Sequence, residues 1–249
     1  MKMYRRVILL VALLVSHPSF SVFTQGTFQN LDFEGAFLVP IPGDVYGRVQ
    51  FAPAFPGWTG FVGGVQQNAA QYNNAFLDSS GISVIDHGSS FPPSILVIEG
   101  NFTAVLQAGF ALGTFQPTDT TLAQTGLIPP GTQTLLFRAY VSSLDPRNFG
   151  VTLGGQTLSL TSLSNAPNYT LYGADISALA GQTAELAFTV FAQNPHMNNR
   201  DLFLDSIQFS NQPIPEPGIL GLFALAASLL GWRLVRSKFR PVPAERNRG

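Results

Sequence analysis

Apolar and polar residues alternate at a spacing of two along the central part of this chain. Four stretches rich in Phe, Val, Leu and Thr show the alternation, namely Thr132–Ser142, Phe149–Leu163, Ala184–Ala192 and Leu202–Ser210. Successive side chains of a strand point to opposite faces, so the pattern predicts strands with one buried face. No part of residues 26–212 keeps the 3.6-residue spacing of a helix over a dozen positions. The pattern therefore excludes a helical domain.

Turn residues separate the predicted strands. Gly154-Gly155 lies between two alternating runs, as in a tight hairpin, and Pro129–Gly131 and Asn165–Asn168 mark longer turns. The Pro-rich segment Leu38–Trp58 indicates an early long loop with a short strand. We predict an all-β domain over residues 26–212, a single antiparallel β-sandwich or jelly roll of about eight to twelve strands.

The apolar face of these strands supplies the expected core. Eight residues on it should face the interior of the sandwich: Phe33, Leu135, Phe137, Leu186, Phe188, Val190, Phe203 and Ile207.

The chain begins with the three parts of a secretory signal peptide. Lys2, Arg5 and Arg6 precede the apolar run Val7–Val15, and Ser21 is the small residue before the expected cleavage point. A buried core helix is the alternative, but the order of the parts favours passage through the export machinery.

Charge and cysteine content limit the function classes. Residues 26–212 contain four cations (Arg48, Arg138, Arg147 and Arg200), no lysine and 12 carboxylates, a formal charge of −8. Nucleic-acid binding depends on neutralising phosphates with Lys and Arg, so we exclude it. The chain has no cysteine, which excludes disulfides, thiolate nucleophiles and zinc-thiolate sites.

The other end joins a Pro-Glu-Pro triplet, an apolar run and a basic cluster. The triplet is Pro215, Glu216 and Pro217, the run is Gly218–Trp232, and the cations that follow are Arg233, Arg236, Lys238 and Arg240. An apolar run with cations on one side predicts a transmembrane helix, here over residues 219–235, with the domain outside the cytoplasmic membrane. An ordinary C-terminal anchor would give the same orientation.

This end resembles the PEP-CTERM sorting signal of Gram-negative bacteria. The resemblance implies an exosortase, a membrane protease-transpeptidase, as partner, in bacteria that make exopolysaccharide. The chain would be held in the inner membrane and then reach the cell surface or the extracellular space. Two features depart from the pattern. Arg233 shortens the uncharged run to about 15 residues, against about 20 for an untilted helix, and the tail is longer than usual. The expected organisation is a signal peptide (1–21), a sandwich (26–212), a sorting signal (213–240) and a cytoplasmic tail (241–249).

The central domain has a second resemblance. The stretches "NLDFEG", "GW" at Gly57-Trp58, "DISALAGQTAELAFTV" and "LFLDSIQFS" resemble the framework of galactose-binding-like jelly rolls, the fold of many carbohydrate-binding modules. The resemblance implies neighbouring first and last strands, a buried Trp58, and a structural calcium with carboxylates from both ends. The matching carboxylates are Glu34 and Asp205. The alternative is that both lie on solvated turns or accept bonds from backbone amides.

Sugar binding needs exposed aromatic rings with a polar edge. The candidates in loops are Tyr46, Tyr72 and Tyr169. They are the predicted ligand-binding residues.

No catalytic residue is predicted. Asp86, His87, Ser89 and Ser90 are too close in sequence to form a catalytic triad on one strand, and the composition around His196 indicates a loop. The favoured function is therefore a non-enzymatic surface or matrix protein, sorted by an exosortase and associated with exopolysaccharide. A carbohydrate-binding module with a defined glycan and a secreted hydrolase are the alternatives.

Overall fold

The computed structural model describes residues 23–24, 26–74, 79–89, 97–111, 116–141, 149–192 and 200–214. The predicted signal peptide, the Pro-Glu-Pro triplet and the predicted helix over residues 219–235 lie outside these ranges. Within them, no helix combines the length and the apolar character needed to span a bilayer.

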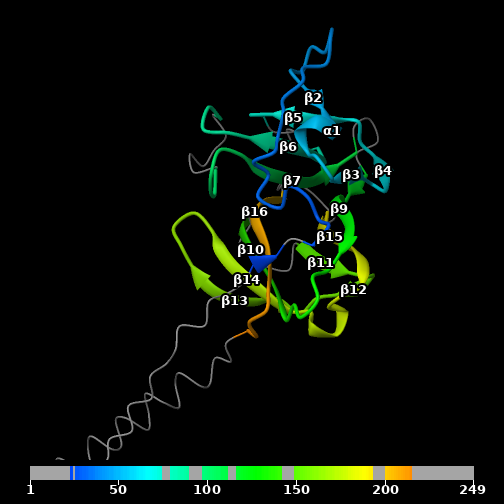
Figure 1. The fold of residues 1–249 in the computed structure, drawn as a ribbon. Coiled ribbons are helices and arrows are strands. Elements are labelled where there is room, and N and C mark those ends of the chain that lie inside the picture. Colours follow the sequence, from blue (N-terminus) through cyan, green and yellow to red (C-terminus); the bar gives the residue numbers. More distant parts are fainter. Residues whose placement is uncertain are drawn as a thin grey trace, which may run out of the picture.

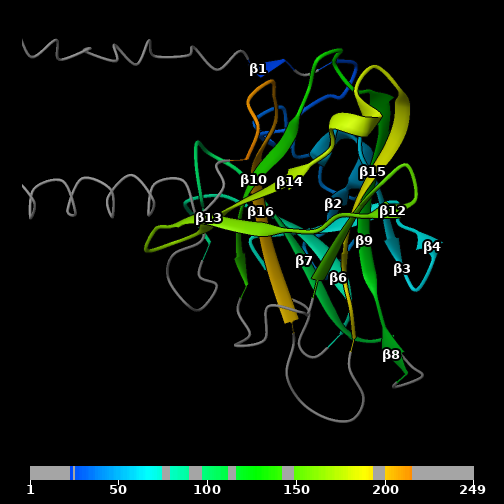
Figure 2. The ribbon, with the colours of Figure 1, turned by 90° about the horizontal axis from the view of Figure 1, so that it is seen from below.

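Two sheets form a sandwich (Figures 1 and 2), which confirms the predicted all-β class. In spatial order, the ten-stranded sheet contains β13 (Thr161–Asn165), β14 (Thr170–Asp175), β10 (Thr134–Val141), β16 (Arg200–Ser210), β7 (Thr103–Phe110), β6 (Gly81–Ile85), β5 (Ala69–Tyr72) and β2 (Val49–Gln50), with β1 (Phe23–Thr24) on β16 and β8 (Pro117–Thr118) on β7. The six-stranded sheet contains β12 (Gln156–Thr157), β11 (Phe149–Leu153), β15 (Thr183–Val190), β9 (Thr120–Leu127), β3 (Thr59–Val62) and β4 (Val65–Gln66). Two short helices are α1 (Phe51–Ala54) and η2 (Ser177–Leu179).

The pairing differs from the prediction in two ways. The described strands number 16 rather than eight to twelve, because five of them have only two residues. β5 and β6 pair in parallel, with Gln71 opposite Ser83, so the sandwich is not purely antiparallel. A spacing of two occurs in strands of either direction, and it therefore cannot predict this pairing.

One predicted core residue, Phe203, faces away from the main core, because β16 contains a bulge between Phe203 and Ile207. All eight are buried, and seven lie in the main core, but Phe203 packs with Ile85 and Val105 in a separate cluster. Leu202 and Leu204 belong to the main core, so Phe203 between them points to the opposite face of the sheet. The register with β10 then shifts where Ser206 has a φ of +49°. The extra residue of a bulge reverses the alternation, so Ile207 faces the main core again.

The two ends of the domain lie side by side. Phe23 of β1 pairs with Ser210 at the end of β16, as the second resemblance implied. The loop of residues 37–48, which we call the Tyr46 loop, projects from the opposite end of the sandwich at the top of Figure 1. The chain therefore leaves the domain far from this loop.

Candidate ligand-binding site

The structure separates the three predicted sugar-binding tyrosines. Tyr46 is 66% exposed. Tyr72 is half-buried against the core, and its hydroxyl donates to Asp86 at 2.7 Å. Tyr169 is half-buried, with the Arg138 guanidinium carbon 5.2 Å from its ring centre. Of the three, Tyr46 offers the most ring surface to a ligand.

Asp44 organises the Tyr46 loop. Its Oδ1 accepts the backbone N–H groups of Tyr46 at 2.8 Å and Arg48 at 3.2 Å, which makes an Asx-type turn. The backbone of Ile41 bonds to that of Arg48 at 3.1 Å across the loop. Gly47 has a φ of +68°, a conformation that glycine adopts without a steric cost. The loop conformation is therefore set by local bonds.

The same carboxylate holds Arg48 against the tyrosine ring. Arg48 donates from Nε to Asp44 Oδ2 at 2.8 Å, and its Nη2 lies 2.5 Å from the same oxygen. The hydrogen bond from Arg48 is the largest of the effects that lower the pKa of Asp44. The guanidinium carbon lies 5.4 Å from the centre of the Tyr46 ring, within the range of a cation–π contact. An exposed ring and a planar donor group are thus held together.

Two further apolar side chains on this loop are exposed. Val45 is 85% and Phe37 is 69% exposed. In the described part of the chain, the large exposed apolar side chains are Phe37, Val45, Tyr46, Val65 and Phe191, so three of the five lie on this loop. The Tyr46 loop therefore carries most of the large exposed apolar side chains in the described part of the chain.

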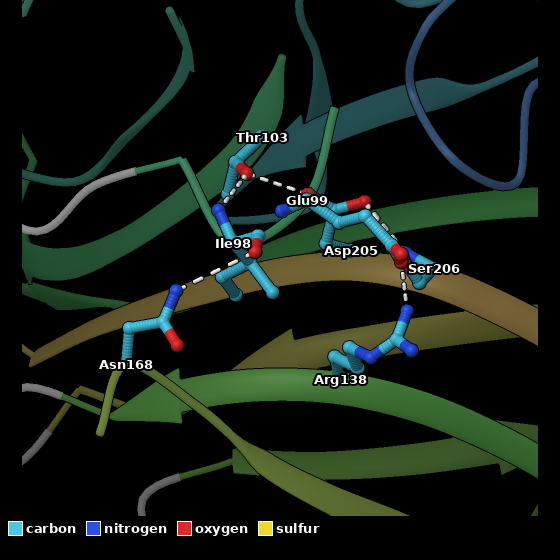
Figure 3. A network of polar contacts seen from close by, with 7 residues as sticks. All are labelled: Ile98, Glu99, Thr103, Arg138, Asn168, Asp205 and Ser206. Carbon is cyan, nitrogen blue, oxygen red and sulfur yellow. Dashed lines mark hydrogen bonds and ion pairs between the residues drawn. The ribbon is translucent and has the colours of Figure 1, made fainter. Parts of the chain in front are cut away.

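A second polar cluster surrounds the buried Asp205 (Figure 3). Its carboxylate accepts the Thr103 hydroxyl at 2.6 Å, the Ser206 N–H at 2.7 Å and the Glu99 N–H at 3.3 Å. Burial raises the pKa of Asp205 to about 7, against the opposing effect of the Thr103 and Ser206 bonds. Burial thus favours the protonated form of this carboxyl group at a pH at which an exposed aspartate is ionised.

Glu34 bonds to residues 101 and 102, which lie between the Glu99 and Thr103 that contact Asp205. It accepts the backbone N–H groups of Asn101 at 2.7 Å and Phe102 at 2.9 Å, and the Asn101 side chain at 2.8 Å. Burial alone would raise the pKa of Glu34, but the bonds from Phe102 and Asn101 lower it. Asp205 bonds to Glu99 and Thr103, so both predicted calcium ligands contact the segment of residues 99–103.

Both carboxylates thus have N–H or O–H donors, which is the alternative to calcium that the sequence allowed. Calcium takes six to eight oxygen ligands. Within the ranges that the structure describes, no three His, Asp or Glu side chains come together in an arrangement suited to a metal. Calcium at Glu34 and Asp205 stays a prediction.

Arg138 connects this cluster to Tyr169. It forms an ion pair with Glu99, whose carboxylate also accepts the Ser206 hydroxyl at 2.5 Å (Figure 3). The side chain of Arg138 is 25% exposed and that of Glu99 is 56% exposed. Sequence reasoning did not nominate either residue. The one available signal was that Arg138 is one of only four cations in the domain.

Asp86 and His87 form hydrogen bonds with neighbouring segments of the fold. Asp86 accepts the Tyr72 hydroxyl, the Asn73 side chain at 2.6 Å and the Gly88 N–H at 2.8 Å. The His87 Nε2 lies 2.9 Å from the Gly100 carbonyl oxygen. These contacts tie neighbouring segments together. Ser90 and His196 lie outside the described residues.

Comparison with protein-family models and with curated protein sequences gave no match. Among solved structures, the chain is similar to TmCBM61 in complex with beta-1,4-galactotriose, with a TM-score of 0.40 and 11% identity over 75% of this chain and 98% of that chain. It is also similar to the K1 and K2 cleaved adhesin domains of Lys-gingipain, the former from Porphyromonas gingivalis W83. For K1 the TM-score is 0.33 at 17% identity, covering 62% of this chain and 90% of that chain. For K2 the TM-score is 0.32 at 16% identity, covering 70% of this chain and 98% of that chain. At such low TM-scores and identities, these likenesses carry no argument about ligand or activity.

Proposed function

We propose that this chain is an exported, non-catalytic surface protein whose sandwich, a galactose-binding-like jelly roll, binds glycan through the Tyr46 loop. The observation that carries the proposal is the exposed Tyr46 ring held beside the Arg48 guanidinium by Asp44. It favours the glycan-binding alternative of the sequence analysis over a protein that only displays its domain.

The chemistry of the loop suits a sugar. A pyranose has an apolar face of C–H groups that packs on an aromatic ring, and hydroxyls that pair with planar polar groups. A guanidinium has five N–H donors, and the bonds to Asp44 engage Nε and Nη2. Because the turn at Asp44 orders the loop before a ligand arrives, binding costs less conformational entropy.

The position of the loop suits display at a surface. The Tyr46 loop and the end of β16 lie at opposite ends of the domain (Figure 1). An anchor after β16 would therefore present the loop away from the membrane. We propose the export machinery and an exosortase as partners that deliver the domain, and exopolysaccharide as the source of the glycan.

A glycan array tests the binding proposal. The full chain is purified in a detergent without a sugar headgroup, because a sugar detergent would compete for the loop. We expect wild type to bind at least one glycan class without releasing reducing sugar. Tyr46→Ala should lose this binding and keep its melting temperature. Val65→Ala, which removes an equally exposed apolar side chain from the β3–β4 hairpin, is the matched control and should bind as wild type does. Release of sugar would instead support the hydrolase alternative.

A separate experiment tests the sorting proposal. The full chain is expressed with and without an exosortase, and its mass is measured. We expect loss of the segment after the Pro215-Glu216-Pro217 triplet only when the exosortase is present. An identical mass in both hosts would leave an ordinary membrane anchor.

A further inference from the structure

We infer that the Tyr46 loop selects neutral glycans and discriminates against glycans that carry carboxylates or sulfates. This inference rests on the proposed glycan-binding function and adds the chemical class of the ligand. It follows from how the few cations of the domain are used.

Cations are scarce in the domain, and those with described side chains are paired. Residues 26–212 contain four arginines against 12 carboxylates. The structure describes the side chains of Arg48 and Arg138, and each forms an ion pair, with Asp44 and Glu99 respectively. Both cations whose side chains the structure describes are therefore compensated by a neighbouring carboxylate.

The pairing in the Tyr46 loop makes its local charge zero. The Arg48 side chain is 38% exposed, and its guanidinium is held against the Asp44 carboxylate. A sugar carboxylate or sulfate that approached Arg48 would lose hydration and would meet a guanidinium already neutralised by Asp44. Removing a charge from water is costly unless a well-placed partner of opposite charge receives it, and here Asp44 already occupies that partner. A neutral hydroxyl has no such requirement and can accept an N–H of the same guanidinium.

The charge of the whole domain acts in the same direction. A formal charge of −8 repels a polyanion, and the repulsion falls off over about 8 Å at physiological ionic strength. Added salt should therefore assist whatever weak binding an acidic glycan shows. The contact between a neutral sugar and Tyr46 involves no net charge and should not depend on salt.

The experiment compares matched pairs of glycans. Neutral oligosaccharides are printed beside their sulfated and uronic-acid counterparts of the same linkage, and the full chain is applied at 50 and 500 mM salt. We expect binding to a neutral member to be at least about tenfold tighter than to its charged counterpart and unchanged by salt. The salt series needs no variant, so it does not depend on the folding of a mutant.

Asp44→Asn tests the cause of the selectivity. Asparagine keeps an oxygen that can accept the N–H groups of Tyr46 and Arg48, but it leaves the Arg48 charge uncompensated. The preference for the neutral member should shrink by about tenfold in this variant. An unchanged preference would overturn the assignment to this ion pair. Charged members bound by wild type as well as neutral ones would overturn the inference but leave glycan binding intact. No binding to any glycan would overturn the proposed function itself.

Discussion

The Thr103 hydroxyl donates a hydrogen bond to the fully buried carboxylate of Asp205, with the two oxygens 2.6 Å apart. The two residues belong to the neighbouring strands β7 and β16 near the centre of the larger sheet. Ser206, at the bulge, donates its N–H to the same carboxylate. An ionisable group is thus enclosed in the sheet, so its protonation is coupled to folding.

Replacing Asp205 should change how stability depends on pH. Burial raises the pKa of Asp205 from 3.8 to about 7. The native state therefore holds a proton that the unfolded state has already released between these values. The contribution of Asp205 to stability is intact below about pH 4 and is lost as the pH rises to 7, by roughly 4 kcal/mol. We expect Asp205→Asn to remove this loss.

Urea unfolding of the full chain at pH 5 and pH 8 measures the effect. Wild type should lose more stability than Asp205→Asn between the two values. The exposed Asp175, whose pKa is lowered mainly by the N–H of Ser177, provides the control Asp175→Asn, which should keep the wild-type loss. Parallel pH profiles for wild type and Asp205→Asn would show that Asp205 does not titrate in this range.

Gly100→Ala should destabilise the fold more than an equivalent change elsewhere. Gly100 has a φ of +65°, and a Cβ there would overlap the Glu34 carboxylate. Gly131 has a φ of +78° with nothing within 4 Å of the same position. Alanine at a positive φ costs about 1 kcal/mol of backbone strain in both variants. Only Gly100→Ala also displaces Glu34 from the Asn101 and Phe102 N–H groups. We expect an additional loss of about 1–3 kcal/mol in unfolding free energy. Equal losses would mean that the Glu34 contacts contribute nothing.

Glu34→Gln should reduce the loss of stability in acid. The bonds from Phe102 and Asn101 outweigh burial and hold the pKa of Glu34 below 4.5. The carboxylate therefore stabilises the fold above that pH, and this contribution is lost as the pH falls through the lowered value. Thermal melts at pH 7 and pH 3 should show a lower melting temperature for Glu34→Gln at pH 7 and a smaller difference at pH 3. A difference that does not shrink would show that the charge of Glu34 is not what matters.

The predicted calcium site is tested by melting the full chain with calcium and with a chelator. A site at Glu34 and Asp205 would stabilise the native state by about 2.7 kcal/mol at a hundredfold excess over the dissociation constant. The melting temperature should then rise with calcium in wild type and not in Glu34→Gln. If calcium does not change the melting temperature of wild type or of Glu34→Gln, hydrogen-bond donors alone hold the two carboxylates.

Local patterns predicted the parts of the fold that depend on neighbours in the sequence. The spacing of two identified six strand residues of the main core, and Gly154-Gly155 forms the predicted hairpin between β11 and β12 with positive φ at both glycines. Phe33 is buried in the main core as predicted, but it lies in a turn at a φ of +59° and not on a strand. Trp58, predicted to be buried, is 5% exposed and donates to the Asn30 carbonyl at 3.0 Å. The bulge at Ser206 was not predictable, because serine at positive φ carries no signal of its own in sequence.

The site was predicted less completely, because it depends on pairs far apart in the chain. The Tyr72 hydroxyl is engaged in a hydrogen bond to Asp86. The Tyr169 ring lies beneath Arg138, which pairs with Glu99, 39 residues away in the sequence. Loop composition nominates all three tyrosines equally. Only the folded arrangement separates Tyr46 from the other two.

The most direct test of the account is a titration of one neutral oligosaccharide, chosen from the array, into wild type and three variants. We predict that Tyr46→Ala weakens binding by at least about tenfold, which corresponds to the loss of one aromatic contact. Tyr72→Phe and Tyr169→Phe should bind within about twofold of wild type, because their rings stay in place. Wild-type affinity in Tyr46→Ala would contradict the assignment of the glycan site to the Tyr46 loop.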